Sequence, residues 1–334
     1  MKTYLTAFFM TMVCGCLVWM LLFYMVLGSP VSRSQWIHEA YRMKDGAAFA
    51  VTGPKVVFVS GSNVLFGIDS EKLSAFWSMP VVNHAVHAGL GLLYILERSK
   101  RVLKPGDIAI LPLEYEFFQE VDDYSETLLI HMASKDPDYF YALPLVEKVR
   151  VMGKMPLKRL RKGLKSAFHK KPQEGTRGAS VVGYTDTYSV VNINAYGDQI
   201  NLEPKKMSTR DRNKIARLKA VKLDYSGISD YSQDALNDYI NWARTNDICL
   251  IFMPPNHVYF DAYRGPAYRE FLRNIRNYFY KHNVPYIGDP YEHMYEKSYY
   301  FGERYHLNSL GIEKRTRQIL KDTGSDLAGL CESY

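Results

Sequence analysis

Short apolar runs alternate with amphipathic helical segments along most of this chain. Uncharged runs rich in β-branched and aromatic residues predict strands at 56–59, 80–83, 108–113, 248–253 and 284–287. Helical spacing of apolar residues predicts helices at 69–77, 90–102, 232–245 and 267–281, and a last helix after residue 308. Strands and helices that alternate in this way are typical of a parallel sheet with crossover helices. We therefore predict an α/β fold with about five strands.

Residues 120–225 interrupt this alternation between the third and fourth predicted strands. Within them, residues 147–171 carry eleven Lys, Arg or His residues and one acid, and Leu157, Leu160 and Leu164 share one helical face with Phe168. Such a basic amphipathic segment fits either a solvated helix packed on the body or a helix that contacts anionic lipid. The stretch that follows, to about residue 207, is rich in Gly, Ser, Asn and Tyr and is predicted to be irregular.

The amino-terminal residues form a long apolar run. Residues 4–27 contain no charged residue, and as a helix they would be about 36 Å long, enough to span a bilayer with some tilt. Trp19 and Tyr24 lie toward one end, as interfacial anchors do. A cleaved signal peptide is the alternative, but the run is long for one and no cleavage site stands out. We predict an uncleaved anchor at 1–30, a juxtamembrane helix and linker at 31–54, and the α/β domain at 55–325.

Composition and charge narrow the class of partner. With 334 residues and 47% hydrophobic content the chain can bury one large core. The net charge of +7 favours an anionic neighbour, while no zinc-finger spacing or RNA-binding signature supports nucleic acid. Positive charges after the anchor mildly favour a cytoplasmic body, although large domains can be translocated regardless, so this count does not decide. The four cysteines imply no disulfide framework.

A serine follows the first predicted strand. The turn Ser60-Gly61-Ser62-Asn63 connects that strand to a helix that begins near Val64. Ser62 then lies at the carboxyl end of a sheet strand, near a helix N-terminus whose N–H groups can hold an oxyanion. Small polar residues in this place are also ordinary turn formers. Ser62 is therefore a candidate nucleophile that needs a base elsewhere in the chain.

The best candidate base lies near the carboxyl terminus. His306 is in a loop just before a helix that Asn308 can cap, and Glu303 can reach back to the ring Nδ1. A lone histidine of this kind is also commonly structural. Asn256 follows the fourth strand, where it can bind substrate or simply form a turn. Because the remaining histidines match no zinc motif, we predict neither a metal nor another cofactor.

The order and spacing of these blocks resemble the SGNH (GDSL-like) hydrolase superfamily. The matching positions are Gly61-Ser62-Asn63, residues 81–89 with Ala88 or Gly89 donating a backbone N–H, and Glu303-x-x-His306. The resemblance implies a three-layer flavodoxin-like parallel sheet in which Ser62, His306 and Glu303 are catalytic. The insertion at 120–225 has no counterpart in these blocks.

Two positions depart from the superfamily's pattern. Glu114 falls where the superfamily has an Asn that holds the oxyanion, and an ionised carboxylate there would repel the developing negative charge. We expect Glu114 to point away, to be protonated, or to be replaced as a donor by Asn63 or Asn256. The second departure is Glu303 itself, which stands in place of the usual Asp.

An amino-terminal anchor within this superfamily points toward proteins that modify cell-surface polymers. The resemblance implies a single-pass protein of the cytoplasmic membrane with its body outside the cytoplasm. It would act as an O-acyltransferase or esterase on acyl esters, acetyl above all, of a surface polysaccharide. A membrane-bound O-acyltransferase is the implied partner and source of the acyl group. The alternative is a catalytically inactive scaffold in a polysaccharide assembly or export complex, which Glu114 favours.

Overall fold

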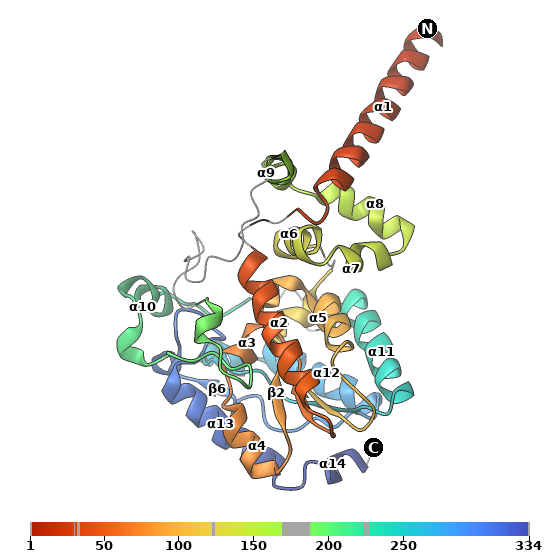
Figure 1. The fold of residues 1–334 in the computed structure, drawn as a ribbon. Helices are drawn as coiled ribbons and strands as arrows, with labels where there is room; N and C mark the ends of the chain where they lie inside the picture. Colours follow the sequence, from red (N-terminus) through yellow and green to blue (C-terminus); the bar gives the residue numbers. More distant parts are fainter. Residues whose placement is uncertain are drawn as a thin grey trace. The chain divides into compact units, whose positions relative to one another are not determined.

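The computed structural model describes residues 2–29, 31, 34–121, 124–168, 188–222 and 227–332. They fall into two compact units (Figure 1). The first lies within Met1–His38 and Tyr124–Asp186, and the second within Glu39–Asp123 and Thr187–Tyr334. Helix α2 (Gln35–Ala50) runs from the first unit into the second.

The described part of the first unit is built from helices. They are α1 (Lys2–Val26), α6 (Glu126–Lys135), α7 (Pro137–Ala142), α8 (Leu145–Lys154) and α9 (Leu157–Phe168). Helix α1 is long and apolar enough to cross a membrane, as predicted. The described part of the basic segment, residues 147–168, lies in two helices, because Pro156 cannot continue α8. Residues 169–187, which include much of the predicted irregular stretch, lie outside the described residues.

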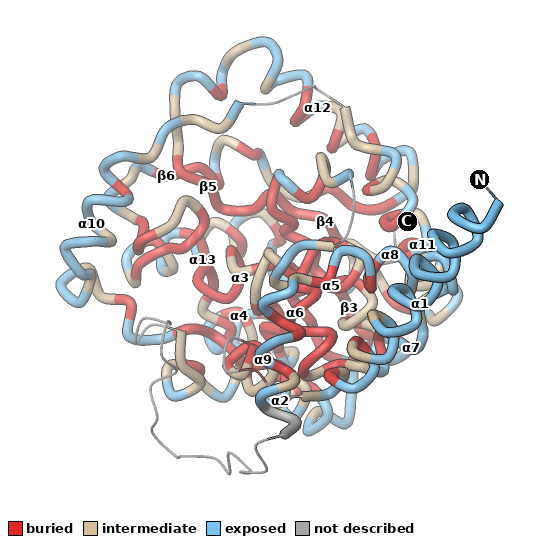
Figure 2. The backbone as a smooth tube through the Cα atoms, turned by 90° about the horizontal axis from the view of Figure 1, so that it is seen from above, coloured by how far each residue is buried: buried red, intermediate tan, exposed pale blue. Residues whose placement is uncertain are grey.

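The second unit contains a parallel sheet of four strands. The strands are β1 (Val56–Phe58), β2 (Val81–Asn83), β3 (Ile108–Leu111) and β4 (Cys249–Phe252). Their order is β2-β1-β3-β4, and the α/β prediction is confirmed. Nearly every residue of these strands is buried (Figure 2), which explains why they read as continuous apolar runs in the sequence.

The fifth predicted strand, 284–287, contributes a single bridge and not a full ladder. It lies beside β4, where the Phe252 N–H donates to the Pro285 carbonyl at 2.8 Å and the Ile287 N–H donates to the Phe252 carbonyl at 2.9 Å. Pro285 has no N–H to donate, so pairing cannot extend through it. The sheet therefore has four strands, where about five were expected.

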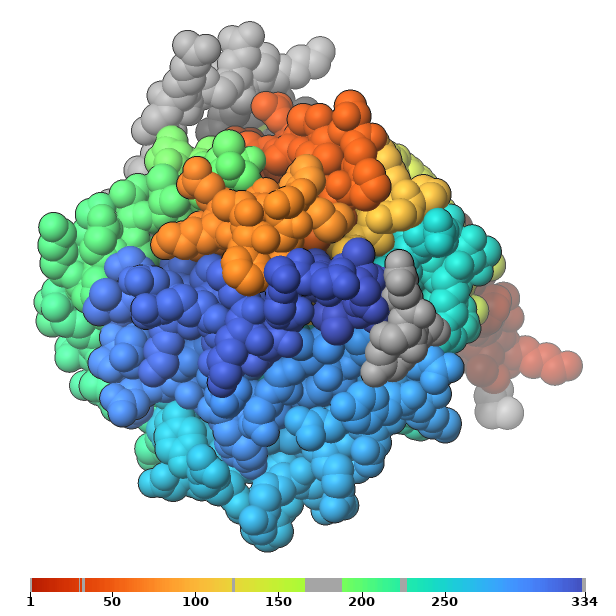
Figure 3. All heavy atoms as spheres, turned by 90° about the horizontal axis from the view of Figure 1, so that it is seen from below, coloured from red at the N-terminus to blue at the C-terminus, as the bar shows by residue number. Residues whose placement is uncertain are grey.

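Helices cover both faces of this sheet. Val56, Phe58 and Ile110 face a core shared with α4 (Ser70–Trp77) and α13 (Ser309–Thr323). Figure 3 shows these two helices side by side, α4 in orange and α13 in dark blue. On the other face Phe252 stacks on Phe279 of α12, with ring centroids 4.1 Å apart. The helices of that layer are α5 (Leu92–Ser99), α11 (Asp230–Thr245) and α12 (Pro266–Lys281).

Shorter elements complete the second unit. They are α3 (Ser62–Leu65), α10 (Thr209–Ala216), α14 (Gly329–Glu332) and the parallel pair β5 (His257–Val258) and β6 (Met294–Tyr295). A disulfide joins Cys249 of β4 to Cys331 of α14, with the Cα atoms 5.8 Å apart. The sequence analysis implied no disulfide framework, because these cysteines are 82 positions apart and only folding brings them into contact.

Candidate active site

Ser62 and His306 lie within hydrogen-bonding distance at the carboxyl end of β1. The strand ends at Phe58, the chain turns, and Ser62 opens the short helix α3. Its Oγ is 2.9 Å from the Nε2 of His306, a residue 244 positions away in the sequence. The structure thus brings together the predicted nucleophile and the predicted base.

The His306 ring is held in a buried position. It stacks on Phe66 with the ring centroids 4.0 Å apart and an interplanar angle of 9°. The next residue, Leu307, donates its N–H to the Phe66 carbonyl at 3.1 Å. Two residues on, the Asn308 side chain accepts hydrogen bonds from the N–H groups of Leu310 and Gly311, so the predicted helix cap is confirmed.

Burial keeps His306 neutral. Burial, with smaller contributions from the neighbouring His87 and Lys214 side chains, lowers the pKa of His306 to about 3. A neutral imidazole whose Nε2 accepts the Ser62 proton carries its own proton on Nδ1. This is the tautomer that a general base for a serine nucleophile requires.

Tyr188, and not Glu303, contacts the second ring nitrogen of His306. The Tyr188 hydroxyl is 3.3 Å from Nδ1. The Glu303 carboxylate instead forms an exposed ion pair with Lys214 of α10, contrary to the expectation that it would orient the histidine. Tyr188 was missed because it lies in a segment without periodicity or motif, where no sequence pattern pointed to a contact with residue 306.

Glu114 lies beneath the serine turn and organises it. One carboxyl oxygen, Oε2, is 2.9 Å from the Ser60 Oγ and accepts the Gly61 N–H at 3.1 Å. The other, Oε1, accepts the Asn63 N–H at 3.0 Å. Gly61 is required here, because a Cβ on it would come within 2.4 Å of Glu114 and 2.7 Å of Ala88.

The hydrogen bonds around Ser60 are compatible with a protonated Glu114. The Ser60 hydroxyl carries one proton, yet it lies 2.7 Å from the Pro112 carbonyl and 2.9 Å from the Glu114 Oε2. If the hydroxyl donates to Pro112, a proton on Glu114 completes the second contact. Burial raises the pKa of Glu114, which favours the same neutral form. A neutral carboxyl would not repel an oxyanion near Ser62.

The Asn63 side chain is fully buried and engaged in the interior. Its Nδ2 donates to the Ser60 Oγ at 2.7 Å and to the Pro112 carbonyl at 2.8 Å. Its Oδ1 accepts a hydrogen bond from the buried Arg315 of α13 at 3.1 Å. Asn63 therefore fixes the turn and is not directed at a substrate, contrary to the expectation that it would serve as an oxyanion donor.

Ala88 packs closely against the serine turn, since a Cβ added to Gly61 would come within 2.7 Å of it. The Gly89 N–H donates to the His87 Nδ1 at 2.8 Å, so this candidate donor is already engaged. Within the described residues, the backbone N–H groups of Ser62 and Ala88 have no hydrogen-bond acceptor. Both groups are therefore candidate donors for a substrate oxygen.

Asn256 supports the histidine loop from behind. It is fully buried, and its Nδ2 donates to the carbonyl of Tyr305, the residue before His306, at 2.6 Å. This contact fits the structural role that the sequence left open for Asn256, and a contact of Asn256 with substrate stays a prediction. His84 is also removed from the site, because its Nε2 pairs with Asp45 at 2.9 Å. In the described part of the chain, no cluster of three or more His, Cys, Asp or Glu residues could hold a metal ion.

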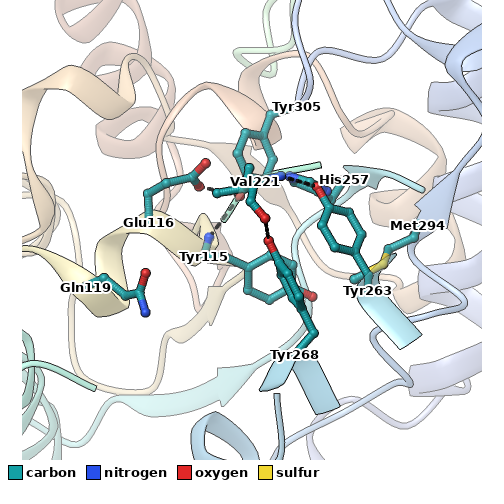
Figure 4. Close-up of a pocket in the computed structure, with 9 residues that line it drawn as sticks. All are labelled: Tyr115, Glu116, Gln119, Val221, His257, Tyr263, Tyr268, Met294 and Tyr305. Atoms are coloured by element: carbon teal, nitrogen blue, oxygen red, sulfur yellow. Dashed lines mark hydrogen bonds between the residues drawn. The ribbon is translucent and has the colours of Figure 1, made fainter. Parts of the chain in front are cut away.

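A separate pocket lies beside the same loop (Figure 4). Tyr305 points into it and its hydroxyl donates to Glu116 at 2.5 Å, while the adjacent His306 faces Ser62. The pocket holds about 320 Å³ of empty space, part of it continuous with solvent. It is lined by Tyr115, Glu116, Gln119, Val221, His257, Tyr263, Tyr268, Met294 and Tyr305. None of the predicted catalytic residues lines it.

The fold and the site together define an α/β protein with a serine–histidine pair at the carboxyl edge of a parallel sheet. Open α/β sheets bind their ligands at this edge. Comparison with protein-family models and with curated proteins finds no match to this chain.

Proposed function

We propose that this protein is a membrane-anchored, SGNH-like acyltransferase or esterase that acts on acyl esters of a cell-surface polysaccharide. The observation that carries the proposal is the 2.9 Å contact between the Ser62 Oγ and the His306 Nε2. A hydroxyl hydrogen-bonded to a neutral buried imidazole is the arrangement that activates a serine nucleophile. The strand order supports a flavodoxin-like fold, since the segment 284–287 beyond β4 extends it in the sense 2-1-3-4-5.

The proposed reaction has two steps. In the first, the Ser62 Oγ attacks the carbonyl carbon of an acyl donor while its proton passes to the His306 Nε2. The negative charge that develops on the carbonyl oxygen is held by the N–H groups of Ser62 and Ala88. The leaving alcohol takes the proton from His306, and the acyl group stays on Ser62. In the second step His306 deprotonates a sugar hydroxyl or water, whose oxygen attacks the acyl carbon. The bond between that carbon and the Ser62 Oγ breaks, the proton returns from His306 to the Ser62 Oγ, and the acylated sugar or the free acid leaves.

The contact between Tyr188 and the His306 Nδ1 bears on how fast the proposed acyl transfer would be. In this tautomer the Nδ1–H of His306 donates to the Tyr188 hydroxyl. A neutral phenol stabilises the transient imidazolium less than a carboxylate does, because it carries no opposing charge. We therefore propose slow transfer to a bound acceptor more than rapid hydrolysis.

The proposed location is the cytoplasmic membrane, crossed once by α1, with the second unit outside the cytoplasm. The disulfide between Cys249 and Cys331 supports this side, because disulfides form and persist in oxidising compartments. A membrane-bound O-acyltransferase is the proposed source of the acyl group, by the resemblance described above. A surface polysaccharide is the proposed acceptor.

The test is the acyl content of the surface polymer in the native cell. Ser62→Ala, expressed at the wild-type level, should lower that content as far as deletion of the whole chain does. Ser74→Ala serves as the matched control, because the Ser74 hydroxyl donates to the Met79 carbonyl in a part of α4 away from the catalytic pair. An unchanged acyl content in Ser62→Ala would remove the catalytic claim.

The second candidate is an inactive scaffold of the same fold in a polysaccharide assembly or export complex. It is favoured by the pairing of Glu303 with Lys214, which leaves His306 without a carboxylate partner among the described residues. A scaffold of this kind predicts that Ser62→Ala supports normal polymer acylation, whereas deletion of the chain does not. Comparing polymer acylation in the Ser62→Ala strain with that in the deletion strain therefore distinguishes the two candidates.

A further inference from the structure

The helices that follow α1 in the first unit expose both apolar and basic side chains. On α8, Leu145, Val146 and Val149 are 76%, 67% and 58% exposed. Leu157, at the start of α9, is 71% exposed. Helix α9 contains no acid, and four further exposed side chains on it are basic: Lys158, Arg161, Lys162 and Lys165. Large apolar side chains gathered on adjacent helices usually mark an interaction surface.

Two contacts fix these helices to the carboxyl-terminal end of α1. The Trp19 indole N–H donates to the Met152 carbonyl of α8 at 3.0 Å. The buried Arg159 of α9 donates through Nη2 to the carbonyls of Val26 at 3.2 Å and Ser29 at 2.8 Å. Trp19 lies seven residues before the end of α1, a distance of about 10 Å along the helix axis. The end of α8 therefore lies beside the last two turns of α1.

The same contacts define how much of α1 is left for lipid. Phe23 and Val26 are buried within the unit, at 0% and 1% exposure, so the last turn of α1 packs on protein. The helix from Lys2 to Leu22 would be about 31 Å long, close to the thickness of a bilayer's hydrocarbon core. Helices fixed at the level of Trp19 and Val26 then lie where the hydrocarbon core meets the headgroups.

We infer that α8 and α9 form an interfacial platform that binds the anionic headgroups of the bilayer that α1 spans. The exposed apolar side chains of the platform enter the boundary of the acyl chains, and the basic residues of α9 contact lipid phosphates. The charge of the platform suits an anionic membrane surface, because α9 offers four exposed cations and no anion and follows a helix long enough to span a membrane. Each basic side chain near an anionic surface strengthens binding roughly fivefold. The inference rests on the proposed membrane span of α1.

The test measures the environment of α8 in the full-length protein reconstituted into nanodiscs. In a Cys14→Ser, Cys16→Ser background, Val149→Cys carries an environment-sensitive fluorophore, and Phe76→Cys, which is 45% exposed on α4, carries it as the control. Brominated lipids in discs of phosphatidylcholine with phosphatidylglycerol should quench the label at position 149 at least severalfold more than the label at position 76. Equal quenching at the two positions would overturn the inference.

The charge requirement is tested with a triple variant. Lys158→Gln, Arg161→Gln and Lys162→Gln together should abolish the gain in quenching that phosphatidylglycerol gives over phosphatidylcholine alone. The matched control removes three exposed charges of α12 by Arg269→Gln, Arg273→Gln and Lys281→Gln, and should keep that gain. A gain that survives the α9 variant overturns the role of the basic residues.

Two further outcomes separate the alternatives. If the label at position 149 stays in water in pure lipid discs but becomes protected in native membranes, the platform binds a protein and the lipid inference fails. Extraction with alkaline carbonate tests the span of α1 separately, since an integral protein stays in the membrane fraction. The acylation test on Ser62 is independent of both results.

Discussion

Glu114 decides at the scale of single residues whether the serine turn can support chemistry. The sequence placed an acidic residue where an oxyanion donor was expected, and this seemed to oppose catalysis. In the structure its carboxyl contacts the Ser60 hydroxyl and accepts the N–H groups of Gly61 and Asn63. It therefore shapes the turn that carries Ser62, and its burial raises its pKa toward the neutral form.

Substitutions of Glu114 should separate shape from charge. Glu114→Ala leaves the buried N–H groups of Gly61 and Asn63 without an acceptor and should lower the free energy of unfolding by roughly 2–4 kcal/mol. Glu114→Gln keeps the volume, the neutral charge, a donor for the Ser60 Oγ and an acceptor for the Asn63 N–H, and loses only the acceptor for the Gly61 N–H, so it should lose less than Glu114→Ala does. Denaturant unfolding of both variants in detergent measures the difference. Equal losses would show that Glu114 is ionised in the folded protein.

At the scale of secondary-structure elements, local sequence predicted most of the second unit. The four strands and the helices between them follow from apolar periodicity, because a parallel sheet covered on both faces leaves continuous apolar runs. The weak fifth strand depends on Pro285, whose missing N–H limits a ladder that periodicity alone would extend. The helical face predicted from Leu157, Leu160, Leu164 and Phe168 lies in α9, and Pro156 separates this helix from α8.

The candidate site was less predictable than the elements that carry it. Ser62 and His306 occupy positions that strand ends and helix caps reveal, so the pair was found from the sequence. The directions in which the other candidate side chains point could not be predicted, because they depend on packing between segments that are distant in the sequence. Asn63 and Asn256 turn into the core, and Glu303 pairs with Lys214 across a contact that no local pattern encodes.

The disulfide ties one edge strand to the last helix, and its loss should be measurable. Cys249→Ser with Cys331→Ser should lower the free energy of unfolding by about 2–5 kcal/mol, because the bond closes a long loop in the unfolded chain. The matched control is Cys14→Ser with Cys16→Ser, since both of those cysteines are free and exposed. Reduction with dithiothreitol should lower the stability of the wild type to that of the first variant and leave the first variant unchanged.

At the scale of the whole molecule, buried neutral histidines couple folding to pH. Burial lowers the pKa of His257 and of His306 to about 3, and it also lowers the pKa of His84 and of His293. The unfolded chain binds protons at these groups near pH 6.5, while the folded chain does not until the pH is much lower. Stability should therefore be lost as the pH falls from about 6.5 toward 3.

The free energy of unfolding of the full chain in detergent should be lower at pH 5 than at pH 7. Each histidine with a pKa near 3 contributes roughly 1–2 kcal/mol to this loss, and buried Glu114, whose pKa is raised, acts in the opposite sense above pH 4.5. His257→Gln should remove its own share, so its stability should fall less between the two pH values. An identical fall in the wild type and in His257→Gln would contradict the pKa of His257.

The central claim is that Ser62 is a nucleophile activated by His306. The most direct measurement is intact-mass spectrometry of the purified full-length protein after reaction with a fluorophosphonate, followed by peptide mapping. We predict one phosphonyl adduct, on Ser62, that is absent in Ser62→Ala and forms at least tenfold more slowly in His306→Ala. Ser74→Ala should react as the wild type does. A folded wild-type protein that gains no adduct, or one whose adduct persists in Ser62→Ala, would contradict the account.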